Sequence, residues 1–429
     1  MALLGIVPRR CVNLPPGSLG VLVGSLLSGK VREGPDLEPF QAELARWLGV
    51  PHVFGASSGR SAFLLALQAL DLPAGAEIIF PAFTFPVMPM VAKILGYRPV
   101  FCAVDLETFN SGPEHIAPRI NARTGAVLAT HLFGRPCPIE GIAELARAKK
   151  IRLMEDCAHA CGVRVSGRQV GSFGDIGVFS FAQGKNMPCF GGGAIATCDE
   201  QIAARARRIV TETPLPPTAA LRSEALSVWV KWLLTRPTLF ALSAYPVLRL
   251  RLAQGKPLMD SEVGDELLTS FQRSRPCFSP MGNIQAALGR LQLGHIDAFN
   301  AGARRNGQIL TRELADIPGI RVPPADGDHI YVYYPITVEG GRRDELRDLL
   351  LRHGVDTKTS DMADCGLLEA FRGADAPLSP GQKPLEASVL EICVYPTISQ
   401  QAIRRIARVI RGWAGLSPTA SRAAGASVS

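Results

Sequence analysis

The sequence predicts an α/β fold, with a mostly parallel sheet that carries helices on both faces. Short apolar runs alternate with helical patterns through the first half of the chain, and they lie at 53–56, 77–80, 100–104, 125–130, 151–154 and 177–181. Such runs are typical of parallel strands, because helices bury both faces of the sheet. Nearer the C-terminus, two more strand patterns predict a smaller α/β domain, at 331–338 and 392–395.

Helical periodicity marks the segments around these strands. Residues 282–299 form an amphipathic pattern that predicts the helix linking the two domains, and a second helix is expected at 302–314. The last helix is expected at 401–413, where arginines lie on one face. The linking helix therefore separates a large first domain from a small second one.

Composition narrows the possible functions. A chain of 429 residues, of which 47% are hydrophobic, can bury the cores of two domains. The net charge of +8 is spread along the sequence, which indicates mild attraction to anions and no nucleic-acid partner. The ten cysteines show neither CxxC nor zinc-ligand spacing, so we expect reduced thiols, no metal site and a cytoplasmic location. The first residues lack the charge-then-apolar order of a signal peptide.

Chemically active side chains cluster where two predicted strands end. The run 151–154 is followed by Asp156 and His159, and the run 177–181 contains Ser180. An isolated lysine, Lys185, follows, and a glycine triplet comes just after it. Ligands of open α/β sheets bind at the carboxyl ends of strands. Pyridoxal 5′-phosphate (PLP) needs a lysine for the Schiff base, an acid for the pyridine nitrogen and donors for the phosphate, and these residues supply all three.

These motifs resemble a known family. EDCAHA at 155–160, GSFGDIGVFSF at 171–181, Lys-Asn at 185–186 and the triplet at 191–193 are similar, in order and spacing, to the core of the DegT/DnrJ/StrS family of PLP-dependent sugar aminotransferases. The similarity runs from about residue 19 to 413, with one interruption. It implies the aspartate-aminotransferase-like fold, known as fold type I, with PLP as the cofactor.

The resemblance also implies roles for single residues. Lys185 would form the Schiff base and then move the proton between the substrate carbon and the cofactor. Asp156 would keep the pyridine nitrogen protonated, and it is otherwise a helix N-cap. His159 would contact the phenolate side of the cofactor, and Ser180 would bind the phosphate. His131, at another strand end, is expected to be structural.

Two further segments are implied to hold the cofactor. In the turn at 57–61, which leads into a helix, free backbone N–H groups suit an anion, and the match to the family implies that Gly59, Arg60 and Ser61 bind the phosphate. The family often has threonine where Arg60 stands, so this arginine either adds charge to the site or faces solvent. Phe85, in the PAFTFP motif, would stack on the pyridine ring, and the alternative is an ordinary core phenylalanine.

The implied function is transfer of an amino group, from glutamate, to a nucleotide-linked keto sugar in glycan or secondary-metabolite biosynthesis, by a homodimer. Two alternatives stay open. The keto substrate could be lipid-linked or otherwise membrane-borne, or the protein could bind PLP and regulate without turnover. Three departures from the family bear on this choice. An Asn-x-Arg-Met pattern is replaced by FSPM at 278–281, Gly191 stands in place of a glutamate, and the substrate loop at 353–365 lacks its usual histidine.

The predicted organisation has four parts. They are an N-terminal arm at 1–18, a large PLP-binding domain at 19–280 with an apolar insertion at about 212–275, a linker helix and small domain at 281–414, and a disordered tail at 415–429.

The most apolar part of the insertion, 225–252, contains Trp229 and Trp232 together with several arginines. Its longest uncharged stretch is well below the roughly 20 residues that span a bilayer. We expect a helical hairpin packed on the enzyme or its partner, a peripheral contact with the inner face of a membrane, or a lid over the active site.

Overall fold

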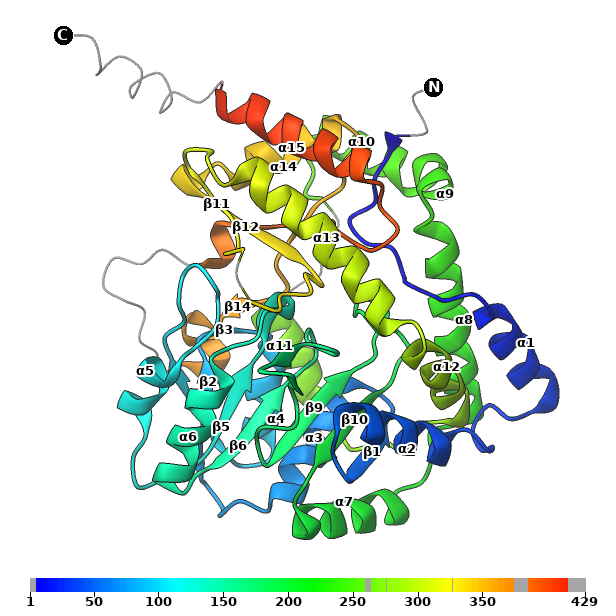
Figure 1. Cartoon of the computed structure of the whole chain (residues 1–429), viewed down its shortest axis with the longest axis vertical. Helices are drawn as coiled ribbons and strands as arrows, with labels where there is room; N and C mark the ends of the chain where they lie inside the picture. Colours follow the sequence, from blue (N-terminus) through cyan, green and yellow to red (C-terminus); the bar gives the residue numbers. More distant parts are fainter. Residues whose placement is uncertain (1–4, 259–263, 275, 326, 374–384, 416–429) are drawn as a thin grey trace.

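A seven-stranded sheet forms the centre of the larger part of the molecule (Figure 1). The computed structural model describes residues 5–258, 264–274, 276–325, 327–373 and 385–415, so most of the predicted tail lies outside the described residues. The strands are β1 (His52–Ala56), β2 (Glu77–Pro81), β4 (Arg98–Cys102), β5 (Thr124–Thr130), β6 (Arg152–Asp156), β9 (Ile176–Ser180) and β10 (Gly193–Thr197). Their order is β1-β10-β9-β6-β5-β2-β4.

Pairing within this sheet is mostly parallel, as predicted. Neighbouring strands from β9 through β6, β5 and β2 to β4 run in the same direction. Only β10 is antiparallel to its neighbours, β1 and β9. The parallel strands therefore end at one edge, where the side chains that follow them meet.

Helices cover both faces of the sheet because successive residues of each strand point to opposite sides. Phe80, Leu128 and Met154 pack with α3 (Gly59–Leu70), α4 (Val87–Ile94) and α7 (Glu200–Glu212). The residues that precede them in the chain, Ile79, Val127 and Leu153, pack with α6 (Ile139–Lys149) on the other face. Nearer β1 and β10, this second face is covered by α2 (Leu37–Leu48) and α12 (Asn283–Leu293).

A smaller antiparallel sheet lies beside the first. Its order is β11-β12-β15-β13, with bounds Ile320–Arg321, Tyr334–Val338, Val389–Ile392 and Lys358–Thr359. It packs against α13 (Ile296–Leu314), α14 (Arg343–Arg352) and α15 (Gln400–Gly415). A short antiparallel pair, β3 (Phe83–Thr84) with β14 (Ala363–Asp364), joins the two parts of the molecule.

The linking helices differ from the prediction. Helix α12 ends at Leu293, and Gly294 is its C-cap. Helix α13 then begins at Ile296 and continues without interruption through Gly302. A Cβ atom at Gly302 would lie 2.8 Å from the Cβ of Pro396. This glycine therefore serves close packing inside a helix, and sequence periodicity alone cannot distinguish that use from a helix end.

The N-terminal arm connects the two parts as well. Val7 forms an isolated bridge with Val355 of the smaller part, and Arg9 forms an ion pair with Asp356 at 2.7 Å. The arm then leads to α1 (Ser18–Ser28), which packs on α12. The arm therefore runs from the smaller part of the molecule to α12 of the larger part (Figure 1).

The insertion consists of four helices, and the part expected as a hairpin, 225–252, contains the end of one helix and two more. The four helices are α8 (Thr218–Leu234), α9 (Pro237–Leu242), α10 (Ala244–Ala253) and α11 (Asp265–Arg273). Their buried side chains attach α8 to α12, α9 and α10 to α14 and the arm, and α11 to α4. Proline begins α9, as expected of a residue that fits the first turn of a helix. Among the described residues, no helix is both long and apolar enough to cross a bilayer.

Candidate active site

A cavity of about 460 Å³ opens at the carboxyl edge of the large sheet. Thr130, Asp156 and Ser180, the last residues of β5, β6 and β9, all line it, because parallel pairing brings these strand ends side by side. Lys185 and His159 line the same cavity. The residues that the sequence pattern grouped together are therefore neighbours in space.

Burial changes the proton affinity of the two central ionisable groups. Burial raises the pKa of the Asp156 carboxyl above its ordinary value, although one oxygen accepts a hydrogen bond from the N–H of Ala158 at 3.0 Å. Burial also lowers the pKa of Lys185 to about 8. About a tenth of such a lysine is neutral at pH of about 7, far more than of an ordinary lysine, and the buried acid favours a cationic partner.

The histidines in this region have different surroundings. Phe133 N–H donates to Nδ1 of His159 at 3.2 Å, so its neutral ring carries the proton on Nε2. Burial lowers the pKa of His159 well below its ordinary value, and the positive charge of Lys185 acts in the same direction. His131 is fully buried, accepts the N–H of Cys137 at Nδ1 and lies 3.3 Å from a carboxylate oxygen of Glu155. These contacts fit a structural role for His131.

The turn before α3 offers unpaired backbone donors. Ser58 is the N-cap of this helix, and its hydroxyl accepts the N–H of Ser61 at 3.1 Å. The N–H groups of Gly59 and Arg60 have no hydrogen-bond partner in the described part of the chain. A Cβ atom at Gly59 would lie 2.7 Å from Oγ of Ser180, so only glycine lets the turn approach the end of β9 this closely. The result is a helix N-terminus with free donors beside a hydroxyl.

The glycine triplet at 191–193 packs against the backbone of this turn at Ser58. Gly192 forms an isolated bridge with Ser58, and its φ of +107° lies in a region that favours glycine. A Cβ atom at Gly193 would lie 2.7 Å from the carbonyl oxygen of Ser58. The triplet thus allows two backbones to meet, which is a physical reason for glycine at these positions.

The side chains of two residues assigned to the phosphate turn differ in their relation to the cavity. The Ser61 hydroxyl bonds to both the carbonyl and the N–H of Ser279, at 2.8 Å each, and its side chain does not line the cavity. Ser58, which the sequence analysis did not select, lines the cavity in its place. Arg60 lines the cavity but is exposed, with its guanidinium 5.8 Å from the ring centre of Phe271 in α11.

Other lining residues come from distant parts of the chain. Phe85 is half-buried and lines the cavity, as expected, and Leu267 of α11 brings one helix of the insertion to its wall. Arg10 of the arm, Tyr333 and Asp361 line it as well. No local motif marks Arg10 and Tyr333, which reach the cavity only through packing of the arm and the smaller part against the large sheet, whereas Asp361 lies in the segment 353–365 that was compared with the family's substrate loop.

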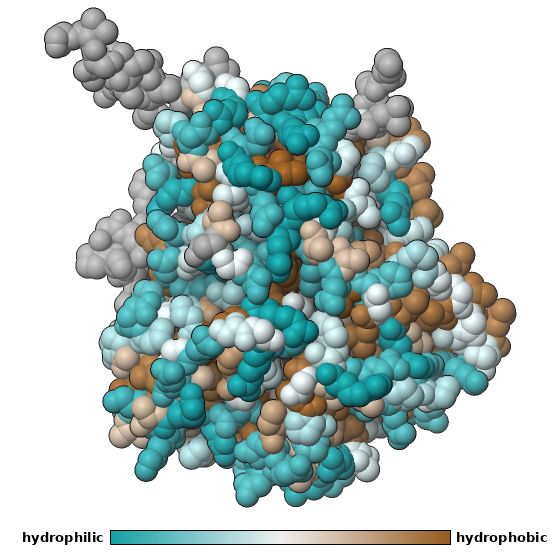
Figure 2. All heavy atoms as spheres, in the orientation of Figure 1, coloured by the Kyte–Doolittle hydropathy of each residue, from teal (hydrophilic) through white to brown (hydrophobic). Residues whose placement is uncertain are grey.

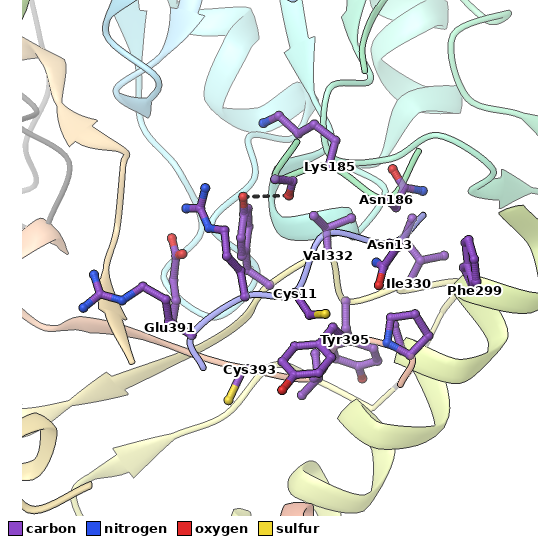
Figure 3. Close-up of a pocket in the computed structure, with 18 of the residues that line it drawn as sticks. Cys11, Asn13, Lys185, Asn186, Phe299, Ile330, Val332, Glu391, Cys393 and Tyr395 are labelled. Carbon is purple, nitrogen blue, oxygen red and sulfur yellow. Dashed lines mark hydrogen bonds between the residues drawn. The ribbon is translucent and has the colours of Figure 1, made fainter. Parts of the chain in front are cut away.

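The loop that carries Lys185 is held from the side opposite the cavity. Asn186 donates from Nδ2 to the carbonyl of Cys161 at 2.6 Å and to Oδ1 of Asn300 at 2.9 Å. A narrow second pocket adjoins this loop, between the arm, α13 and the smaller sheet. In Figure 3 the side chain of Lys185 extends away from Tyr395 and Cys11 of that pocket. The adjacent Asn186 therefore anchors the loop while Lys185 faces the other way.

Comparisons with known proteins agree with this architecture. The chain matches the family model of the DegT/DnrJ/EryC1/StrS aminotransferase family over residues 19–216 and 277–411. It is similar to dTDP-3-amino-3,4,6-trideoxy-alpha-D-glucose transaminase of Streptomyces venezuelae, with 28% identity over 90% of this chain and 89% of that one. It also resembles UDP-N-acetyl-3-dehydro-alpha-D-glucosamine 3-aminotransferase of Acidithiobacillus ferrooxidans, with 28% identity over 86% of each.

Among solved structures, an aminotransferase from Psychrobacter cryohalolentis superposes with a TM-score of 0.75 at 27% identity, over 95% of this chain and 98% of that one. This agreement confirms the predicted fold type I architecture. The family match stops at residue 216 and resumes at 277, which brackets α8–α11. The chain belongs to the DegT/DnrJ/EryC1/StrS aminotransferase family and is an enzyme of the PLP-dependent aminotransferase class.

Proposed function

We propose that the protein uses PLP to transfer an amino group from glutamate to the keto group of a nucleotide-linked sugar. The observation that carries this proposal is the meeting of Lys185, Asp156 and the α3 turn around one cavity. The two curated relatives described above, named as acting on dTDP- and UDP-linked sugars, support the substrate class.

The residues present fit the cofactor. Asp156 is a buried acid without a cationic partner at hydrogen-bonding distance in the described chain, as a pyridinium nitrogen requires. The free N–H groups of Gly59 and Arg60, with the Ser180 hydroxyl beside them, suit the phosphate. When bound, PLP would supply an electron-accepting ring for cleavage of the substrate C–H bond.

The protein's own groups would then perform the proton steps. The neutral amine of Lys185 would attach the cofactor and, once released, would take the proton from the reacting carbon of the amino donor. Asp156 would hold the ring nitrogen in its protonated form. Nε2–H of His159 would donate a hydrogen bond into the site, and Phe85 would exclude water from one side. Each role depends on burial, which strengthens electrostatic contacts.

Labelling tests the attachment site without measuring turnover. The protein would be incubated with PLP, reduced with borohydride and digested, and the peptides would be weighed. We expect the pyridoxyl phosphate mass on the peptide that contains Lys185. Modification of surface lysines such as Lys149 and Lys150, with Lys185 unmodified, would contradict the proposal.

Spectra of the PLP-loaded protein test the reaction and the alternatives. An absorbance band near about 410–430 nm should disappear on adding glutamate and return on adding a nucleotide-linked keto sugar. A band that is insensitive to all amino donors would favour a PLP-binding regulator. A band that returns only with a lipid-linked keto substrate would favour the membrane-borne alternative.

We also propose that the enzyme acts as a cytoplasmic homodimer. Closed two-fold pairing is the commonest arrangement of soluble oligomers, and the resemblance to the family implies it here. All ten cysteines are free, which suits a reducing compartment. Light scattering of the PLP-loaded protein should give twice the chain mass of 45.9 kDa. A stable and fully active monomer would overturn this proposal.

A further inference from the structure

Exposed apolar side chains are concentrated on one part of the surface. Twelve large hydrophobic residues are exposed in the described part of the chain, and all but Leu367 belong to α1, α8, α9 and α10. The eleven are Leu19, Val23, Leu27, Leu226, Val230, Leu233, Leu234, Leu239, Leu242, Val247 and Leu250, and we call them the apolar face. Figure 2 shows hydrophobic atoms gathered along the right-hand edge, over α1, α8 and α9 of Figure 1. Such a concentration marks an interaction surface.

Helix α1 shows the pattern most clearly. Its eleven residues include no charged side chain. Leu19, Val23 and Leu27 follow one another at intervals of four, so they share a face, and Leu27 is 84% exposed. The opposite side already buries Leu22 in the core. A surface helix of a water-soluble enzyme normally directs polar residues outward, so α1 is suited to a second apolar environment.

Helix α8 is apolar on two sides. Leu221, Ala225 and Val228 are buried against α1 and α12. Leu226, Val230, Leu233 and Leu234 lie on a different side and are exposed. The buried set accounts for the attachment of α8 to the enzyme. The exposed set is not needed for that attachment, so packing within the described chain does not explain why these four residues are apolar.

Basic residues outnumber acidic ones in the segment that carries most of this surface. Residues 218–258 contain one acidic side chain, Glu224, and six basic ones, which are Arg222, Lys231, Arg236, Arg249, Arg251 and Lys256. Among the residues that the structure describes, none of the six forms an ion pair with an acidic side chain. Arg222 and Lys231 are exposed, so their charge is available to an external anionic partner, whereas Lys256 lies in a pocket that Asp344 and Asp348 also line.

Aromatic residues lie at the border between core and surface. Trp229 and Trp232 are half-buried and stacked, with ring centres 4.6 Å apart. The guanidinium of Arg236 lies 4.1 Å from the ring centre of Trp232. Tryptophan and arginine beside exposed leucines are the composition found where a protein enters the headgroup region of a bilayer.

We propose that the apolar face rests in the interfacial layer of an anionic lipid membrane. Aliphatic side chains would enter the acyl boundary, and the surrounding cations would contact lipid phosphates. A second copy of the chain fits less well, because a two-fold contact through this face would bring two sets of six cations together against one acid each. Anionic lipid satisfies both the apolar and the charged groups.

Vesicle sedimentation of the full-length, PLP-loaded protein tests the proposal. Wild-type protein should sediment with phosphatidylcholine vesicles that contain phosphatidylglycerol, and much less with phosphatidylcholine alone. Combining Leu226→Gln, Val230→Gln, Leu233→Gln and Leu234→Gln should weaken binding at least about tenfold, because four apolar side chains lose their lipid contact. The matched control is Leu367→Gln, at the one exposed large hydrophobic outside the face, and it should bind like wild type.

Substitution of two basic residues tests the contribution of positive charge to lipid binding. Arg222→Gln with Lys231→Gln should weaken binding to anionic vesicles by about fivefold for each substitution, since both side chains are exposed on α8. Lys149→Gln with Lys150→Gln, at exposed lysines far from this segment in the sequence, should leave binding unchanged. Melting curves and the cofactor absorbance of every variant would verify that it folds.

Three results would overturn the proposal. They are failure of the wild type to sediment with anionic vesicles, equal binding by the four-glutamine variant, and conversion of a wild-type dimer to a monomer by that variant. The last result, obtained from light scattering without lipid, would assign the face to a second copy of the chain.

Discussion

The strand-end cavity and the apolar face both have charged side chains nearby, but those in the cavity are largely removed from solvent and those near the apolar face reach it. In the cavity, Asp156 and His159 are buried and Lys185 is half-buried, and desolvation shifts the pKa of each. On the apolar face, the cations reach solvent and aliphatic side chains lie exposed between them. Burial tunes a few groups for proton chemistry, whereas exposure makes a surface available for association. The two regions therefore predict different responses to substitution.

The largest effect should come from Lys185, the half-buried amine of the cavity. Lys185→Ala should reduce transamination by at least about a thousandfold, because both the attachment of the cofactor and the proton transfer lose their amine. Steady-state rates with saturating PLP would measure this loss. Lys149→Ala, at an exposed lysine, is the control and should be silent. Retained turnover in the Lys185 variant would remove this residue from the proposed role.

Asp156→Asn should have the next largest effect. An amide of the same shape keeps the packing but cannot stabilise a protonated ring nitrogen, so the rate should fall by about a hundredfold or more. Titration of PLP absorbance should show that the variant still binds the cofactor. A rate close to that of the wild type would show that the ring nitrogen has another partner.

The pH dependence should give an effect of about tenfold. The pKa of Lys185 is lowered to about 8, so its amine loses a proton as pH rises through that value. The neutral fraction grows about tenfold between pH of about 7 and about 9, and the rate at which cofactor-free protein captures PLP should follow it. Stopped-flow absorbance would record the rates. A rate that still climbs steeply above pH of about 9.5 would indicate an ordinary solvated lysine.

The smallest effect is expected on the apolar face. Leu226→Ser should change the free energy of unfolding by less than about 1 kcal/mol, since this residue is 46% exposed. Val228→Ala, two residues away and fully buried, should cost about 2 kcal/mol. Urea unfolding of both variants would compare them. Equal losses would mean that Leu226 is covered, and the contrast between the two regions would fail.

Six of the seven strands of the central sheet were predicted because they carry their signal locally, whereas β10 (Gly193–Thr197) was not among the predicted runs. Each of the six is a short apolar run, and the polar residue at its end is adjacent in the sequence, as with Asp156 and Ser180. The same argument could not determine which side of a turn faces the cavity. Ser61 was selected by its position in the turn, but its hydroxyl is used by Ser279, which lies more than two hundred residues away.

In the insertion too, the sequence predicts the helices but not which of their sides are buried. Its apolar composition and its prolines indicated helices, and these are present. Which of its apolar residues are buried depends on α1, α12 and α14, and a pattern inside the insertion contains no information about them. The division of α8 into a buried and an exposed apolar side became visible only once its neighbours were in place.

The sequence by itself determined the class of sheet, the residues at its strand ends and the family resemblance, because all three depend on neighbours along the chain. Tertiary structure alone decided that Arg10, Tyr333 and Leu267 line the cavity and that eleven apolar residues face outward. Burial and its effect on pKa are sums over every group that surrounds a side chain. Those groups come from segments whose separation in the sequence does not indicate their distance in space.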